Sequence, residues 1–431
     1  MQIILLNTSE CRGGAAVAAR RLVKSLRNIG EAVKMLVYEK QTSDQEVVSL
    51  NTNSIRQKIV FLRFCWEHVV IFFLNNFKKK NLFAISIANT GTNISNHDLI
   101  KEADIIHLHW INQGFLSLSD LKKLIASGKP VVWTLHDLWP ATAICHYPDK
   151  CEKYQSECSL CSLQVASPLF DLAAWTYKRK KKIGLDKVHF VGCSRWITEM
   201  AKKSSLLEGA SFTSIPNPID TTVFKSIKKS DARALLHLPE DKFLLLFAAA
   251  KLSDKRKGAS FLIEACSLLK QNYADKIEIV LMGNGSEELC RALPFKVNSL
   301  GYISDQSTMV AVYSCADLFV IPSLEDNLPN TIMESMACGT PCVGFATGGI
   351  PEMIDHKING YVANYMDAND LANGIQWILN NPDPQALSEA CVKKVQENYT
   401  EEVVAKQYIA LYERLLQKKS GSWIEEGKTT Y

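Results

Sequence analysis

The chain has 431 residues, which is too many for one ordinary hydrophobic core and predicts two to three domains of α/β size. Hydrophobic residues make up 47% of the chain and charged residues 22%, the composition of a soluble globular protein. The formal net charge is +4, from 49 basic and 45 acidic residues, and this small excess predicts no nucleic-acid partner.

The first residues favour a β-strand over a secretion signal. Ile3–Leu6 is an apolar run of only four residues with no basic region before it, whereas a signal peptide needs a longer apolar segment and a cleavage site of small residues. We therefore expect a cytoplasmic protein, and we expect its thirteen cysteines to be reduced thiols rather than a disulfide framework.

Strands and helices alternate in the first half of the sequence. Ala15–Ile29 places its apolar side chains near one face of a helix, and Gly30 is a suitable residue to end that helix. Apolar runs predict strands over Gln2–Leu6, Val33–Val37, Asp104–His109, Val131–Leu135 and His189–Val191. Strands that alternate with helices predict a parallel sheet covered on both faces.

The alternation restarts after a connector around Asn217, where Pro216 and Pro218 prevent both a helix and a central strand. Apolar runs then predict strands over Phe243–Ala248, Ile277–Met282, Leu318–Ile321 and Pro341–Phe345. Two doubly wound halves joined near Asn217 are the simplest architecture. The last helical segment, Thr400–Gln417, either completes the second half or returns to the first, and the sequence leaves both open.

One apolar segment, Ile59–Leu74, is rich in aromatic residues and is followed by the basic run Lys78–Lys80. Because Arg63 and Glu67 interrupt it, the segment is too short and too charged to cross a bilayer. Two interpretations stay open: a helix in a membrane interface, over residues 56–80, and a buried surface helix of the first domain. Residues 175–182, which combine aromatic with basic side chains, favour the membrane slightly.

Open parallel sheets bind ligands beyond the carboxyl ends of their strands, so the loops after the strands are the expected sites of chemistry. Gly13 and Gly14 follow the first strand, where free backbone N–H groups suit an anion, although an ordinary tight turn also explains them. In the second half, Lys251 and Lys257 lie in the corresponding loop. Two lysines there suit a diphosphate, and a solvated basic loop is the alternative.

An acidic loop follows the predicted strand Leu318–Ile321 and contains Glu325 and Asp326. A helix is expected to begin near Asn330, with its free N–H groups at the same edge of the sheet. Glu334 lies one turn into this helix, where its carboxylate is placed to accept hydrogen bonds from the hydroxyl groups of a ligand.

Four cysteines form a separate group, Cys145, Cys151, Cys158 and Cys161, with His146 beside the first of them. The spacing of the last two is that of half a tetrahedral zinc site, whereas the spacing of the first two is less diagnostic. A structural zinc that holds this loop and a set of free thiols remain two open interpretations.

The acidic segment, residues 322–341, resembles the E-x7-E motif of glycosyltransferase family 4, whose members have the two-domain GT-B fold. Further landmarks of that family follow in its order: Trp133–Asp137, Ile215–Asp220, Lys251 with Lys257, Met282–Gly285 and Gly348–Glu352. The resemblance covers nearly the whole chain, and five ordered landmarks make it specific.

The resemblance implies an α/β protein of GT-B fold, with two Rossmann-like doubly wound domains facing across a cleft. Residues 1–216 would form the acceptor-side domain, residues 217–400 the nucleotide-sugar-binding domain, and residues 401–431 a C-terminal helix and tail. The implied activity is retaining transfer of a sugar from a nucleotide-diphosphate sugar to an acceptor, with no obligatory metal cofactor.

The resemblance also implies roles for individual residues. Lys251 and Lys257 would stabilise the departing diphosphate, Asp326 and Glu334 would hold hydroxyl groups of the donor, and His136 would position the transferred sugar. A histidine at a strand end is often structural, but the resemblance favours the catalytic role for His136. The expected donor-binding residues are Gly13, Gly14, Gly283, Glu325, Asn327, Leu328, Asn330 and Thr331.

Three positions depart from the family's pattern. Asp326 stands at the position of the first glutamate, Pro329 at a position that is often glycine, and Lys251 at a position that is usually arginine. A lysine keeps the charge but loses the bidentate fork of arginine. These departures question the identity of the donor more than the activity.

The segment Leu324–Glu334 is also similar to the branch of the family that builds bacterial surface polysaccharides. This likeness favours a glycan or lipid-linked glycan as acceptor and peripheral contact with the inner face of the plasma membrane. Two other functions stay open. One is a nucleotide-sugar epimerase of the same fold, which needs no acceptor, and the other is a non-catalytic binding or scaffold protein.

Overall fold

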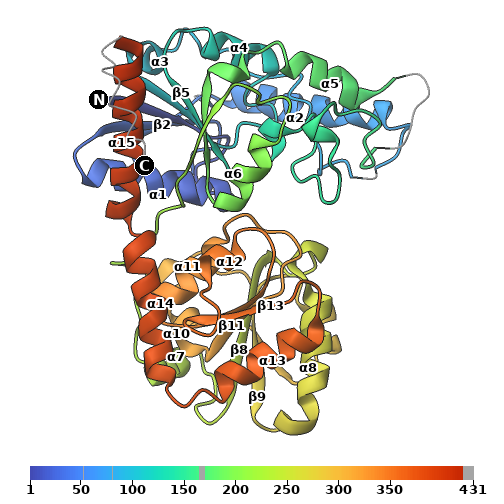
Figure 1. Ribbon diagram of the computed structural model, residues 1–431, viewed down its shortest axis with the longest axis vertical. Coiled ribbons are helices and arrows are strands. Elements are labelled where there is room, and N and C mark those ends of the chain that lie inside the picture. The colour runs from blue at the N-terminus through green and yellow to red at the C-terminus, as the bar shows by residue number, and fades with distance from the viewer. Residues whose placement is uncertain (52, 80, 165–169, 421–431) are drawn as a thin grey trace, which may run out of the picture. The chain divides into compact units, whose positions relative to one another are not determined.

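The computed structural model describes residues 1–51, 53–79, 81–164 and 170–420. The chain divides into two compact units, which Figure 1 colours from blue to green and from yellow to orange. Unit 1 comprises Met1–Ile215 and the chain from Val404 onward, and unit 2 comprises Pro216–Val403. The last helix, red in Figure 1, therefore belongs to unit 1 from Val404 on.

Unit 1 is built on a seven-stranded sheet of order β3-β2-β1-β4-β5-β6-β7, in which every named pair of strands is parallel. The chain order reverses direction between β1 and β4, as in a doubly wound fold. The strands are β1 (Gln2–Leu6), β2 (Ala32–Val37), β3 (Val47–Ser49), β4 (Ile105–Leu108), β5 (Val131–Leu135), β6 (Val188–Gly192) and β7 (Ser211–Ser214).

The helices of unit 1 cover both faces of this sheet. They are α1 (Gly14–Asn28), α2 (Ser54–Leu74), α3 (Asp98–Glu102), α4 (Leu118–Ile125), α5 (Leu172–Lys180), α6 (Arg195–Lys202) and α15 (Glu401–Ser420), with short 3-10 turns η1 (Trp139–Ala141), η2 (Lys153–Gln155) and η3 (Leu185–Lys187). Successive residues of a strand point to opposite faces. Accordingly Ile4 and Leu6 join the core that contains α4, whereas Ile3 and Leu5 join the core that α1 and α15 complete.

The C-terminal helix supplies polar as well as apolar contacts to unit 1. The hydroxyl of Tyr412 hydrogen-bonds Nδ1 of His107 at 2.7 Å, and the hydroxyl of Tyr408 lies 3.0 Å from Oγ1 of Thr134. Both tyrosines are buried in the core shared with α1. Of the two placements that the sequence left open for this helix, the structure has the return to the first domain.

Unit 2 contains a six-stranded parallel sheet of order β10-β9-β8-β11-β12-β13. Its strands are β8 (Phe243–Lys251), β9 (Ile277–Asn284), β10 (Lys296–Ser299), β11 (Leu318–Ile321), β12 (Cys342–Phe345) and β13 (Gly360–Ala363). Its helices are α7 (Lys229–Leu235), α8 (Ala259–Tyr273), α9 (Glu287–Ala292), α10 (Gln306–Cys315), α11 (Asn330–Ala337), α12 (Ile350–Met353), α13 (Ala368–Leu379) and α14 (Pro384–Asn398), with a 3-10 turn η4 (Lys255–Lys257).

The two parallel sheets with helices on their faces confirm the α/β, doubly wound fold class that the sequence predicted. The central strands are continuous apolar runs because both of their faces are buried, for example residues Ile3 to Leu6 and residues Leu318 to Ile321. Among the described helices, none has both the length and the hydropathy needed to cross a bilayer.

Candidate functional site

In unit 2, four loops meet at the carboxyl ends of β8, β9, β11 and β12. The backbone N–H of Leu324, in the loop after β11, donates to the carbonyl of Arg256 after β8 at 2.7 Å. The N–H of Gly349, after β12, donates to the carbonyl of Asp326 at 3.2 Å. The acidic and basic loops that the sequence singled out are therefore neighbours at the ligand-binding edge of one sheet.

Lys257 and Asp326 form an ion pair across these loops. The ammonium of Lys257 lies 2.6 Å from Oδ2 of Asp326, and the two side chains are 31% and 15% exposed. Ser323 also donates to Oδ2 of Asp326 at 3.3 Å. Lys251, at the end of β8, has an exposed side chain. This edge of the sheet thus presents two ammonium groups, one of them held in place by a carboxylate.

Two glycines allow the loops to approach this closely. Gly258 has φ of +71°, and a Cβ atom there would lie 1.7 Å from the carbonyl oxygen of Pro322. Gly348 has φ of +57°, and its Cβ would lie 1.7 Å from the carbonyl oxygen of Asp326. Any side chain at either position would push the basic and acidic loops apart, so glycine there is a requirement of the site's geometry.

Helix α11 begins directly after the acidic loop. Pro329 precedes its first residue, Asn330, and no side chain caps its first turn. The N–H of Ile332 in the first turn donates to the carbonyl of Pro329 at 3.1 Å, and the helix dipole makes this end of α11 electrostatically suited to an anion. In the same helix Glu334 is 4% exposed and accepts a hydrogen bond from the hydroxyl of Tyr313 at 2.8 Å.

The other predicted donor-binding residues of unit 2 lie at the same edge of the sheet. Asn327 and Leu328 are nearly buried in the acidic loop, at 5% and 7% exposure, and Glu325 is half-buried beside them. Thr331 is the second residue of α11. Gly283 lies near the end of β9, where a Cβ atom would lie 1.8 Å from the carbonyl oxygen of Ala249.

In unit 1, Gly13 and Gly14 begin helix α1 after the loop that follows β1. Gly13 is the N-cap residue with φ of +89°, no side chain caps the helix, and its first turn contains no acidic residue. The positive end of the α1 dipole is therefore electrostatically suited to a negatively charged ligand.

His136 follows β5 and belongs to a buried group of imidazoles. Its Nε2 hydrogen-bonds Nδ1 of His109 at 2.9 Å, and its Nδ1 lies 3.7 Å from Sγ of Cys193. Burial lowers the pKa of His136 to about 4 and the pKa of His107 to about 3, so both rings are neutral at physiological pH. A neutral His136 carries no charge, and a hydrogen bond from its ring to a sugar would replace one of these two partners.

A second polar group, also after the carboxyl end of β5, was not predicted from the sequence. Asp137 accepts hydrogen bonds from Nδ1 of His146 at 2.7 Å, from the indole N–H of Trp110 at 3.1 Å and from the backbone N–H of Trp139 at 2.9 Å. Burial alone would raise the pKa of Asp137, but the interactions with His146 and these donors outweigh it and lower that pKa. The adjacency of Asp137 to His136 in the sequence is the signal that could have identified this group.

The four predicted metal ligands, Cys145, Cys151, Cys158 and Cys161, line one small cavity of about 20 Å³. Burial raises the pKa of the Cys145 thiol to about 12, which favours the protonated form. Within the described residues, no three His, Cys, Asp or Glu side chains are arranged so that they hold a metal ion. The structural zinc therefore stays a prediction.

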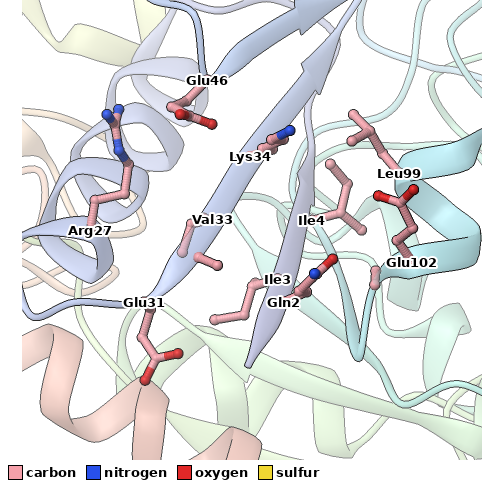
Figure 2. Close-up of a pocket in the computed structure, with 12 residues that line it drawn as sticks. Gln2, Ile3, Ile4, Arg27, Glu31, Val33, Lys34, Glu46, Leu99 and Glu102 are labelled. Atoms are coloured by element: carbon pink, nitrogen blue, oxygen red, sulfur yellow. The ribbon is translucent and has the colours of Figure 1, made fainter.

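A larger cavity of about 300 Å³ lies at the other end of the unit 1 sheet. Figure 2 shows that Gln2 and Val33, near the amino ends of β1 and β2, line it together with charged side chains from neighbouring segments, among them Arg27 and Glu31. Parallel sheets bind ligands at the carboxyl ends of their strands, so this cavity is not a candidate for the active site.

Two family models match the chain. Residues 12–223 match "Glycosyltransferase Family 4", and residues 242–381 match "Glycosyl transferases group 1". The first segment lies almost entirely in unit 1 and the second lies in unit 2. The chain belongs to glycosyltransferase family 4. The resemblance that the sequence motifs suggested is thereby confirmed.

Curated relatives of this family-4 chain include two bacterial glycosyltransferases. An N,N'-diacetylbacillosaminyl-diphospho-undecaprenol α-1,3-N-acetylgalactosaminyltransferase of Campylobacter jejuni is 28% identical over 163 residues, 37% of this chain and 42% of that protein. The amylovoran biosynthesis glycosyltransferase AmsK of Erwinia amylovora is 28% identical over 203 residues, 42% of this chain and 47% of AmsK. The chain thus spans less than half the length of the relatives it matches.

Solved structures confirm the GT-B fold of this family-4 chain. A sucrose-phosphate synthase of Thermosynechococcus elongatus superimposes with a TM-score of 0.67 at 21% identity, covering 97% of this chain and 100% of that one. HepE of Anabaena, solved in complex with UDP and glucose, gives a TM-score of 0.62 at 17% identity and covers 96% and 100% of the two chains. At these identities the likeness establishes the fold.

Proposed function

We propose that this protein is a retaining glycosyltransferase that moves a sugar from a nucleotide-diphosphate sugar to a glycan acceptor. The observation that carries the proposal is the pair of Lys257 and Asp326 at the edge of the unit 2 sheet, 2.6 Å apart, in the part of the chain that matches "Glycosyl transferases group 1". A cation and a carboxylate side by side provide one partner for a diphosphate and one for sugar hydroxyls.

The donor is a nucleoside diphosphate bonded to the anomeric carbon of a sugar. Lys257 and Lys251 bind the diphosphate, and the positive end of the α11 dipole adds to the electrostatic attraction of the same charge. Asp326, already oriented by Lys257 and Ser323, accepts hydrogen bonds from the sugar. The complex of HepE with UDP and glucose supports uracil as the first base to test.

In the reaction, the bond between the anomeric carbon and the diphosphate oxygen breaks, and a bond from the anomeric carbon to the acceptor hydroxyl oxygen forms on the same face. The departing phosphate oxygen takes the proton of the acceptor hydroxyl. Negative charge grows on the diphosphate as the first bond breaks, and positioned cations stabilise that charge more in the transition state than in the ground state. His136, neutral at physiological pH, positions the transferred sugar.

The acceptor we propose is a lipid-linked glycan of cell-surface polysaccharide synthesis, used on the cytoplasmic face of a membrane. The two curated relatives support this choice, because the name of one contains a sugar linked to diphospho-undecaprenol and the name of the other contains amylovoran biosynthesis. No observation favours the nucleotide-sugar epimerase or the non-catalytic scaffold protein.

A thermal-shift screen against UDP-, GDP-, ADP- and TDP-sugars tests the donor proposal. A ligand at a hundred times its dissociation constant stabilises the folded state by about 2.7 kcal/mol. We expect one nucleotide class to raise the melting temperature of the wild type and to raise that of the Lys257→Ala variant much less. If none of the donors shifts the wild-type protein, the proposed function is wrong.

A further inference from the structure

Helix α2 presents an apolar stripe to solvent. Residues three or four apart lie on one face of a helix. Six such positions along one face of α2 are apolar, and every one is between 41% and 68% exposed. They are Ile55, Ile59, Leu62, Trp66, Val69 and Phe73, which we call the α2 stripe. Three further aromatic residues, Phe61 within α2 and Phe77 and Phe83 after it, are 65%, 64% and 69% exposed.

The opposite face of α2 fixes this orientation with polar contacts inside unit 1. Glu67 is 1% exposed, and its Oε1 accepts hydrogen bonds from the hydroxyl of Ser86 at 2.6 Å and from the N–H groups of Ile87 and Ala88 at 2.8 and 2.9 Å. Arg63 donates to the hydroxyl of Tyr38 at 2.9 Å. Charged side chains thus anchor the inner face, so the outward apolar stripe is a fixed feature of the fold and not a helix turned the wrong way.

The charges around the α2 stripe have one sign. Arg56 and Lys58 at its start and Lys78 and Lys79 after its end are exposed. Among residues 53–79 the single acidic side chain is the buried Glu67. An apolar face of aromatic and aliphatic residues flanked by basic residues is the pattern of a helix that lies in a membrane interface.

We propose that the α2 stripe docks on a membrane surface that contains anionic lipids, with the helix axis parallel to that surface. The aromatic side chains of Trp66 and Phe73 enter the layer between headgroups and acyl chains, and Lys78 and Lys79 contact lipid phosphates. A second copy of the chain is the poorer occupant, because pairing two stripes would bring basic residues against basic residues with no exposed acid in the segment to neutralise them.

This surface would hold unit 1 at the membrane, where a lipid-linked acceptor resides, and so it deepens the proposed function. It does not depend on that function, since binding to a vesicle requires neither donor nor acceptor. A failure of the docking proposal and a failure of the proposed function are therefore measured in separate experiments.

The test is co-sedimentation of the full chain with vesicles of phosphatidylcholine alone and of phosphatidylcholine mixed in equal parts with phosphatidylglycerol. We expect binding to the anionic vesicles, weaker binding to the neutral ones, and loss of binding in a Trp66→Glu/Phe73→Glu variant. A Lys78→Gln/Lys79→Gln variant should bind roughly thirtyfold more weakly, since each basic residue near such a surface contributes about fivefold.

The matched control is Leu235→Glu, because Leu235 is 64% exposed on α7 of unit 2, outside the α2 stripe. It should bind vesicles as the wild type does. The melting temperature without donor reports on folding and should be similar in all variants. The proposal is wrong if the wild type does not bind anionic vesicles or if the Trp66→Glu/Phe73→Glu variant binds them as the wild type does. It is also wrong if light scattering shows that the wild type is a dimer and that the Trp66→Glu/Phe73→Glu variant is a monomer.

Discussion

Replacing Lys257 by alanine separates a structural role for its ion pair from a catalytic one. The pair with Asp326 is 2.6 Å long, with side chains 31% and 15% exposed. A pair this accessible contributes about 1 kcal/mol or less to stability, which in a domain the size of unit 2 is a shift of roughly 2–4 °C in melting temperature. Loss of one cation that stabilises a transition-state charge costs far more, about 10²–10³ in rate, or about 2.7–4 kcal/mol.

The assay follows release of the nucleoside diphosphate from the donor identified by thermal shift, together with the melting temperature of each variant. Lys255→Ala is the matched control, since Lys255 lies in the same 3-10 turn η4, is exposed, and makes no ion pair with another residue in the described part of the chain. Turnover of Lys257→Ala close to that of Lys255→Ala, at similar stability, would refute the reasoning and remove Lys257 from the mechanism.

Three further predictions concern unit 1. Asp137→Ala leaves three part-buried donors without this acceptor and should lower the free energy of unfolding by about 1–3 kcal/mol, visible as a lower urea midpoint; an unchanged midpoint contradicts this. The pKa of His107 is about 3 and that of His136 about 4 in the folded chain. Below pH 6.5 these two histidines are therefore protonated in the unfolded chain while they are still neutral in the folded chain. Stability should be complete above pH 6.5 and fall by roughly 1.4 kcal/mol per pH unit per histidine as the pH drops toward 4, and a flat series of melting temperatures would disprove it. Finally, protein purified without added zinc should contain one zinc per chain and Cys158→Ser should contain none, whereas substoichiometric zinc in the wild type rules the site out.

The sequence predicted the interior of each sheet and missed its edges. All nine predicted strands are central, whereas β3, β7, β10 and β13, the four outermost strands, were not predicted. Each edge strand is only three or four residues long, and β7 and β10 have no fully buried residue. An edge strand with one partner and partly exposed side chains needs no continuous apolar run, so its sequence carries little signal.

The candidate site divides in the same way. The loop residues of unit 2 were predictable because a family motif marks them and because they follow apolar strands. The contacts of Asp137 with Trp110 and His146 could not be predicted, because they depend on how the loop between residues 137 and 146 folds back over its own strand. The return of α15 to unit 1 was equally open, because its apolar pattern suits either core.

That return has a consequence for the order of folding. Unit 2 is one continuous stretch of chain, so it can close as soon as Val403 has left the ribosome. Unit 1, although synthesised first, has no cover for His107 and Thr134 until Tyr408 and Tyr412 emerge. During translation one face of the unit 1 sheet therefore stays uncovered until α15, which is synthesised after the whole of unit 2, has left the ribosome. Chaperone dependence during synthesis should accordingly concentrate on the earlier half of the protein.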